Sequence, residues 1–190
     1  GLVAVVGEDL PERGRAIFAA RGGDTEGLEV AGGRCFRWGG RYHTDMNRRD
    51  TLFTHLNVFE HFHPRLPDSY RSTPVVFLAN IHPALQREVL EQVEGPRLVA
   101  VDTMNLWIET ARDELVEVLR RCDMVFLNDE EARQLSGRHH LPQAVAAVQD
   151  LGPRRVVVKK GEHGAILFDG DTRFVLPAYL LDEVHDPTGA

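Results

Sequence analysis

The sequence has few cysteines, no surplus of positive charge and no long apolar run. Its two cysteines, Cys35 and Cys122, lack CxxC spacing, so a disulfide scaffold is disfavoured and a reducing compartment, the cytoplasm, is expected. A formal net charge of -7 argues against a general nucleic-acid or anionic-membrane surface. No apolar run approaches the roughly 18 residues of a membrane span. We therefore expect neither nucleic acid nor a membrane as a partner.

Two common catalytic signatures are also missing. The first apolar run, Leu2–Val6, is not followed by G-x-G-x-x-G, which weighs against an NAD-binding Rossmann domain. For the nine histidines, neither an HExxH pattern nor a cysteine partner supports a metal site, and a solvated loop explains them better. The hydrophobic content of 43% over 190 residues is enough for one main domain.

Apolar runs that alternate with helical patterns predict an α/β fold. Short runs rich in β-branched residues indicate buried strands, and apolar residues three and four apart indicate helices. This alternation favours a parallel sheet that is covered by helices on both faces. The pattern predicts strands at 2–6, 74–79, 98–101, 124–127, 156–158 and 165–168, and helices at 11–21, 84–93, 111–121, 129–135 and 141–151.

A small antiparallel hairpin is predicted in the first third of the chain. Cys35–Trp38 and Arg41–His43 alternate like two strands, with Gly39-Gly40 as the hinge between them. The following segment, Thr44–Tyr70, is rich in histidine, asparagine and arginine and is hard to assign to any element.

Polar residues follow each predicted strand of the sheet. Ligands of parallel α/β sheets bind beyond the carboxyl ends of the strands, so these residues are candidates for binding. A surface or helix-cap role remains the alternative for each of them. The candidates for hydrogen bonds to a hydroxyl-bearing substrate are Arg41 and His43 on the hairpin and Asn80, His82, Asp102 and Asn105 at strand ends.

Three short motifs occur in the last third of the chain. Asn128 and Glu131, on a first helical turn, offer the oxygen ligands that suit Mg²⁺, although an N-cap with acidic residues explains them too. The segment 159–164 (Lys-Lys-Gly-Glu-His-Gly) is a turn signal between two strands. The segment 186–190 (Asp-Pro-Thr-Gly-Ala) is typical of a loop whose N–H groups converge on an anion, or of a turn before a helix.

In this order, the motifs resemble those of the ribokinase-like carbohydrate kinases (the PfkB family), whose C-terminal signature reads Asp-Thr-x-Gly-Ala-Gly-Asp. Pro187 replaces its second residue. The resemblance implies that Gly189 and Ala190 supply anion-hole N–H groups and that the catalytic Asp lies beyond Ala190. The family's glycine-rich sugar motif would precede Gly1. We therefore expect a chain that is cut at both ends and inactive by itself.

The resemblance also implies ATP, Mg²⁺ and K⁺ as cofactors. Mg²⁺ would bind near Asn128 and Glu131, and K⁺, as the monovalent cation, near Asp186 and Thr188. The nucleotide would contact Asn128, Lys159, Gly161 and Gly164. Many relatives carry a small hydroxyl residue at the position of Lys159.

The fold implied by the resemblance is a three-layer α/β/α ribokinase-like fold with a mostly parallel sheet and a small β-lid. Residues 1–30 would start the α/β core, 31–56 would form the lid and the following segment, and 57–190 would hold the nucleotide and metal motifs. The implied activity is transfer of the ATP γ-phosphate to a hydroxyl of a sugar or nucleoside, in a homodimer formed through the lid. The alternative is a noncatalytic sugar- or nucleotide-binding protein on the same fold.

Overall fold

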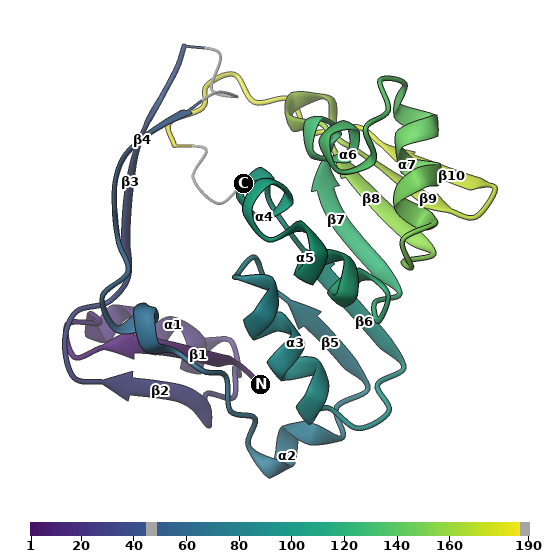
Figure 1. Ribbon diagram of the computed structural model, residues 1–190. Helices are drawn as coiled ribbons and strands as arrows, with labels where there is room; N and C mark the ends of the chain where they lie inside the picture. The colour runs from purple at the N-terminus through teal and green to yellow at the C-terminus, as the bar shows by residue number, and fades with distance from the viewer. Residues whose placement is uncertain (45–48, 187–190) are drawn as a thin grey trace. The chain divides into compact units, whose positions relative to one another are not determined.

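The computed structural model describes residues 1–44 and 49–186, which fall into two compact units (Figure 1). One unit comprises Gly1–Tyr70 with the C-terminal stretch from Leu181, and the other comprises Arg71–Leu180. Within the described residues, no helix combines the length and the apolar character that crossing a membrane requires.

The Arg71–Leu180 unit is built on a six-stranded sheet in the order β10-β9-β8-β7-β6-β5. The strands from β5 to β8 pair in parallel, whereas β9 and β10 are antiparallel to their neighbours. The strands predicted from apolar runs are confirmed, and β10 is an additional one. The strands are β5 (Val75–Leu78), β6 (Leu98–Asp102), β7 (Met124–Asn128), β8 (Arg155–Lys159), β9 (Ala165–Asp169) and β10 (Thr172–Leu176).

Helices α3 to α7 of this unit lie along one face of the sheet (Figure 1). Helix α3 begins with Pro83 and is capped by His82, whose Nδ1 accepts a hydrogen bond from the Ala84 N–H at 3.1 Å. Helix α6 ends at Gly137, whose φ of 68° favours glycine. The helices are α3 (Pro83–Gln92), α4 (Asn105–Thr110), α5 (Arg112–Leu119), α6 (Asp129–Ser136) and α7 (Leu141–Gln149).

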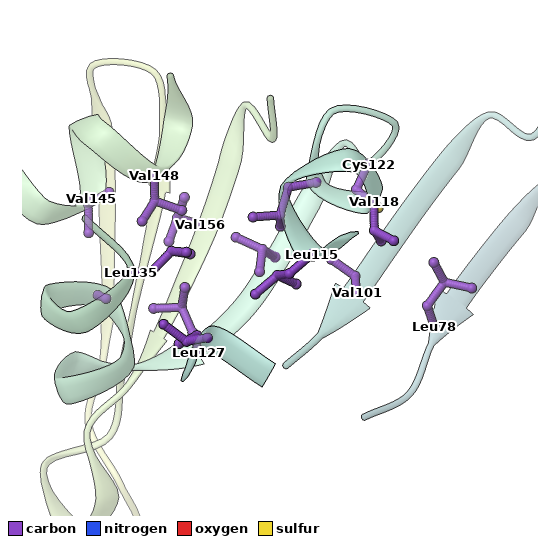
Figure 2. Close-up of a cluster of buried hydrophobic side chains, with 14 of the residues drawn as sticks. Leu78, Val101, Leu115, Val118, Cys122, Leu127, Leu135, Val145, Val148 and Val156 are labelled. Carbon is purple, nitrogen blue, oxygen red and sulfur yellow. The ribbon is translucent and has the colours of Figure 1, made fainter. Parts of the chain in front are cut away.

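The hydrophobic core lies between these helices and the sheet (Figure 2). Val101, Val158 and Leu115 are fully buried there, and burying such a side chain contributes about 1.5–3 kcal/mol. Cys122 belongs to the same core. Its burial, and then the neighbouring Asp123, raises the pKa of the thiol to about 12, so the thiol stays protonated at neutral pH. This core fixes the strands whose ends carry the predicted motifs.

The opposite face of the sheet also carries apolar side chains, and several of them are exposed. In β5, Val75 and Phe77 are 47% and 58% exposed, while the alternate residues Val76 and Leu78 are buried. Phe77 meets Phe126 of β7 edge to face, with ring centroids 5.8 Å apart. The two faces of the sheet therefore differ in burial more than in composition.

In the Gly1–Tyr70 part, the described residues form two separate two-stranded sheets. Strands β1 and β2 pair in parallel, and α1 connects them in the chain. The strand predicted at 2–6 and the helix predicted at 11–21 are thus confirmed. The elements are β1 (Val3–Gly7), α1 (Glu12–Ala20), β2 (Gly27–Ala31), β3 (Arg37–Tyr42), β4 (Arg49–His55), the 3-10 helix η1 (Asn57–His61) and α2 (Asp68–Arg71).

The prediction that Gly39-Gly40 form the hinge of a hairpin is wrong. Both glycines lie inside β3, and the antiparallel partner is β4, which comes from the segment that shows no clear pattern. The ring of Phe53 occupies the space where a Gly39 Cβ would stand, and the ring of Trp38 does the same at Gly40. The glycines therefore make room for aromatic rings at a bulge instead of forming a turn. Residues 45–48, between the strands, lie outside the described residues.

Two arginines hold a carboxylate where β8 begins and β9 ends. Arg154 Nε and Arg155 Nε donate to the two carboxylate oxygens of Asp169, at 2.7 and 2.9 Å. The hydrogen bond from Arg155 and then that from Arg154 lower the pKa of Asp169 from its ordinary value. The charged form of Asp169 is therefore favoured by folding.

Replacing Asp169 by Asn should destabilise the fold only where the carboxylate is ionised. The folded-state pKa lies below the unfolded value of about 3.9, so the contribution is present above that value and is lost as the pH falls through the folded-state pKa. Urea unfolding should show a stability difference at pH 7 that shrinks steadily between pH 5 and pH 2. Asp171→Asn, in the exposed β9–β10 turn, should show no such trend. A pH-independent loss for Asp169→Asn would contradict this explanation.

Candidate functional site

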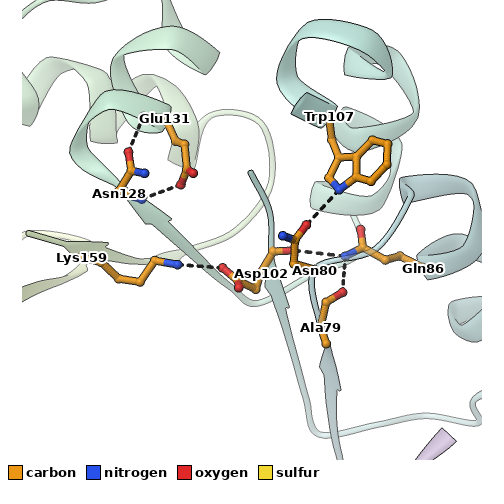
Figure 3. Close-up of polar contacts among 8 residues, drawn as sticks. All are labelled: Ala79, Asn80, Gln86, Asp102, Trp107, Asn128, Glu131 and Lys159. Atoms are coloured by element: carbon orange, nitrogen blue, oxygen red, sulfur yellow. Dashed lines mark hydrogen bonds and ion pairs between the residues drawn. The ribbon is translucent and has the colours of Figure 1, made fainter. Parts of the chain in front are cut away.

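The carboxyl ends of four parallel strands form one edge of the sheet, and predicted site residues gather there (Figure 3). Asp102, Asn128 and Lys159 are the last residues of β6, β7 and β8, and Asn80 lies just beyond β5. Parallel pairing places the carboxyl ends of neighbouring strands side by side, which brings together residues that are far apart in the sequence. The whole edge belongs to the Arg71–Leu180 unit.

Lys159 and Asp102 form an ion pair across this edge. Lys159 Nζ lies 3.1 Å from Asp102 Oδ1, and the two side chains are 46% and 26% exposed. Since β7 lies between β6 and β8, the lysine side chain crosses the end of β7. An ion pair this exposed contributes about 0.2–1 kcal/mol to stability. The sequence assigned Asp102 to the hydroxyl substrate and Lys159 to the nucleotide, and the structure brings the two into contact.

Asn128 and Glu131 form a reciprocal capping box at the start of α6. Asn128 Oδ1 accepts from the Glu131 N–H at 2.8 Å, and Glu131 Oε2 accepts from the Asn128 N–H at 2.7 Å. Glu131 is only 7% exposed. The alternative role considered for this motif, an N-cap, is therefore present in the structure. A carboxylate can accept further bonds at its two oxygens, so capping does not exclude a ligand role.

The start of α6 offers Mg²⁺ some ligands but not a complete set. Within residues 1–44 and 49–186, no three His, Cys, Asp or Glu side chains are grouped so that they could hold a metal ion. Mg²⁺ in proteins is usually held by one or two carboxylates, with water and phosphate oxygens in the other positions. The oxygens of Asn128 and Glu131 therefore fit Mg²⁺ that arrives together with a phosphate ligand.

Gln86, which was not predicted from the sequence, links the ends of β5 and β6 by hydrogen bonds. Its side chain is 1% exposed, and its Nε2 donates to the carbonyls of Ala79 and Asp102 at 2.9 and 3.1 Å. The β5–β6 pairing ends at Leu78 and Val101, so the Gln86 amide joins the two strands one residue further on. Its position four residues before the buried Leu90, on the apolar face of α3, is the signal that could have revealed it.

Two buried polar atoms, one on Gln86 itself and one beside Asp102, have no hydrogen-bond partner in the described part of the chain. They are Gln86 Oε1 and Thr103 Oγ1. Thr103, only 2% exposed, directly follows Asp102 in the chain. Buried polar groups are normally hydrogen-bonded, and an ordered water is the usual partner where the protein supplies none.

Asn80 and His82, just beyond β5, already have partners within the unit. Trp107 Nε1 donates to Asn80 Oδ1 at 2.9 Å, and the His82 ring lies edge to face with Trp107, 5.0 Å between centroids. His82 also caps α3. Asn105 is the exposed first residue of α4. The structure therefore brings Asn80 and His82 together around Trp107.

The glycines predicted beside the nucleotide form the turn between β8 and β9. Gly161 begins the 3-10 helix η2 (Gly161–His163) with a φ of 54°, and Gly164 ends it with a φ of 87°. A Cβ on Gly164 would collide with the carbonyl of Leu176. Both glycines are thus required by the backbone itself, which is the plain-turn alternative, and their phosphate contact stays a prediction.

The other predicted residues belong to the first unit or lie outside the described residues. Arg41 lies in β3, opposite Asp50 of β4, and His43 Nε2 lies 3.2 Å from Asp50 Oδ2. Asp186 is exposed near the end of the described chain. The residues that lie outside the described part are Pro187, Thr188, Gly189 and Ala190.

Comparison with known proteins gives a family match and several relatives. The pfkB family carbohydrate kinase model matches residues 89–190, more than half of the chain, and this range includes all three motifs. The cytidine kinase of Thermococcus kodakarensis is 28% identical over 196 residues, which cover 100% of this chain and 68% of that protein.

Solved structures share the fold over nearly all of this chain. The nucleoside kinase of Methanocaldococcus jannaschii, an archaeal member of the ribokinase family, has a TM-score of 0.75 at 19% identity and covers 99% of this chain. An E. coli structure in complex with ATP and Mg²⁺ has a TM-score of 0.76 at 19% identity and covers 98%. The predicted ribokinase-like α/β fold is confirmed. The chain spans 62% and 64% of these two solved chains.

Replacing Gln86 by Met, which has a similar shape, should lower the free energy of unfolding by about 1–3 kcal/mol. The reason is that the carbonyls of Ala79 and Asp102 lose their side-chain donor, and each hydrogen bond of this kind contributes about 0.5–1.5 kcal/mol. Chemical denaturation checks this, with Gln143→Met on the exposed face of α7 as the matched control. A Gln86→Met variant as stable as the control would show that the hydrogen bonds of Gln86 to Ala79 and Asp102 do not stabilise the fold.

Proposed function

Because the chain belongs to the pfkB family of carbohydrate kinases, we propose that the protein transfers the γ-phosphate of ATP to a hydroxyl group of a sugar or nucleoside. The observation that carries this proposal is the row of Asp102, Asn128 and Lys159 along one edge of the sheet, with Glu131 beside it. The relatives named cytidine kinase and nucleoside kinase make nucleosides the first acceptors to test.

Each residue of the edge has a defined task in such a transfer. Phosphoryl transfer depends mainly on positioning and charge stabilisation, so the protein must hold two substrates in line. Lys159 neutralises phosphate charge, and the hydroxyl substrate hydrogen-bonds to Asp102. Asn128 and Glu131 hold Mg²⁺ together with the phosphates, and the ion offsets the charge that develops on the transferred group.

Several predicted roles stay predictions within this proposal. They concern substrate contacts from Arg41, His43, Asn80, His82 and Asn105, the nucleotide contacts of Gly161 and Gly164, K⁺ at Asp186 and Thr188, and an anion hole at Gly189 and Ala190. The homodimer through the β3–β4 lid and the cytoplasmic location also stay predictions.

A noncatalytic binding protein on the same fold is the second candidate. The observation that favours it is that the predicted site residues are engaged with one another, in the capping box and in the Asp102–Lys159 pair, so these contacts alone assign them no catalytic role. The gene sequence after the codon for Ala190 separates the two candidates. Gly-Asp supports the kinase, and another residue in place of Asp supports binding alone.

The complete gene product should release ADP from Mg-ATP in the presence of one member of a panel of pentoses, hexoses and nucleosides. Glu131→Gln should lower turnover by about tenfold or more and raise the Mg²⁺ concentration needed for half-maximal rate, because a metal ligand loses its charge. Glu130→Gln, an exposed carboxylate on the same helical turn, should leave both within about twofold.

A loss of stability without a change in Mg²⁺ dependence would assign Glu131 to capping alone. Binding of nucleotide and acceptor without any acceptor-dependent ADP release would contradict the kinase proposal and favour the noncatalytic one.

A further inference from the structure

The Asp102–Lys159 pair joins two groups that the proposed reaction uses for different substrates. Asp102 ends β6 and Lys159 ends β8, and Asn128 at the end of β7 lies between them. Figure 3 shows the lysine ammonium directed at the Asp102 carboxylate. Lys159 Nζ lies 3.1 Å from Asp102 Oδ1. While they are paired, the ammonium is less available to a phosphate and the carboxylate is less available to a hydroxyl.

The geometry allows the partners to separate without disturbing the strands. The Asp102 carbonyl is held by Gln86 Nε2 at 3.1 Å, so the backbone at the end of β6 is fixed. The two side chains are 46% and 26% exposed, which leaves both heads within reach of a ligand. Lysine carries a compact charge on a flexible stem, so its ammonium can change partners by rotation about side-chain bonds.

We propose that this ion pair couples the two substrate sites by exchange of partners, an inference that rests on the proposed kinase function. A nucleotide phosphate takes the Lys159 ammonium, and the released Asp102 carboxylate then accepts a hydrogen bond from the acceptor hydroxyl. Whichever ligand binds first separates the pair, and the second ligand finds its partner already released. Each ligand therefore raises the affinity for the other by the same factor.

The strength of the ion pair limits the size of this coupling. A pair with this exposure corresponds to a coupling factor of about 1.4 to 5. Because the heads are partly in solvent, salt should weaken the effect.

The test is calorimetric binding to the complete gene product. Cytidine, or the acceptor with the fastest turnover in the panel above, is titrated with and without a non-hydrolysable ATP analogue and Mg²⁺. The ratio of the two dissociation constants is the coupling factor. The coupling factor should fall by about 1.4- to 5-fold in Lys159→Met and in Asp102→Asn. In the double variant it should be no lower than in either single variant.

Arg154→Gln is the matched control, because this arginine is 73% exposed and its ion pair with Asp169 lies at the opposite end of β8. The control should keep the coupling factor of the unmodified protein. In 0.5 M NaCl the coupling factor of the unmodified protein should approach that of the variants.

An unchanged coupling factor in Asp102→Asn would overturn the inference while leaving the kinase proposal intact. If Lys159→Met abolishes nucleotide binding, Asp102→Asn alone decides, since it retains the ammonium. If the complete gene product binds neither ligand and shows no turnover, the proposed function fails and the inference fails with it.

Discussion

The parallel pairing of β5, β6, β7 and β8 is the constraint on which the candidate site depends. It brings the ends of four strands to one edge, although the residues there come from positions 80 to 159 of the chain. The pairing is held by fully buried valines, such as Val101 and Val158, beneath the helices. Val101 and Val158 directly precede Asp102 and Lys159, so the apolar core fixes the strands one residue before the polar side chains begin.

Gln86 marks the transition between the core and the polar edge. Where the ladder of β5 and β6 stops, its amide donates to one carbonyl from each strand, and so extends the link between them. Burying the Gln86 side chain with its Oε1 unsatisfied lowers the stability of the fold. The two hydrogen bonds that fix the strand ends offset this loss. The Asp102 carboxylate therefore projects from a fixed point, and only its side chain and Lys159 are left to move.

Some parts of the fold and site were predictable from the sequence for a clear physical reason. The strands at 98–101 and 124–127 are continuous apolar runs, and the polar residue after each run locates the edge. The β3–β4 pairing was not predictable, because Gly39 and Gly40 serve as space for rings that come from Trp38 and from distant Phe53. The Asp102–Lys159 contact was also not predictable from the sequence, because it joins β6 and β8, which are not neighbours in the sheet.

A crystal structure of the complete gene product with a non-hydrolysable ATP analogue and Mg²⁺ tests the account most directly. It should show a phosphate oxygen within hydrogen-bonding distance of Lys159 Nζ, near the start of α6, with Asp102 no longer paired to the ammonium. A nucleotide bound away from the carboxyl ends of β6 to β8, or an intact Asp102–Lys159 pair beside bound phosphates, would contradict it.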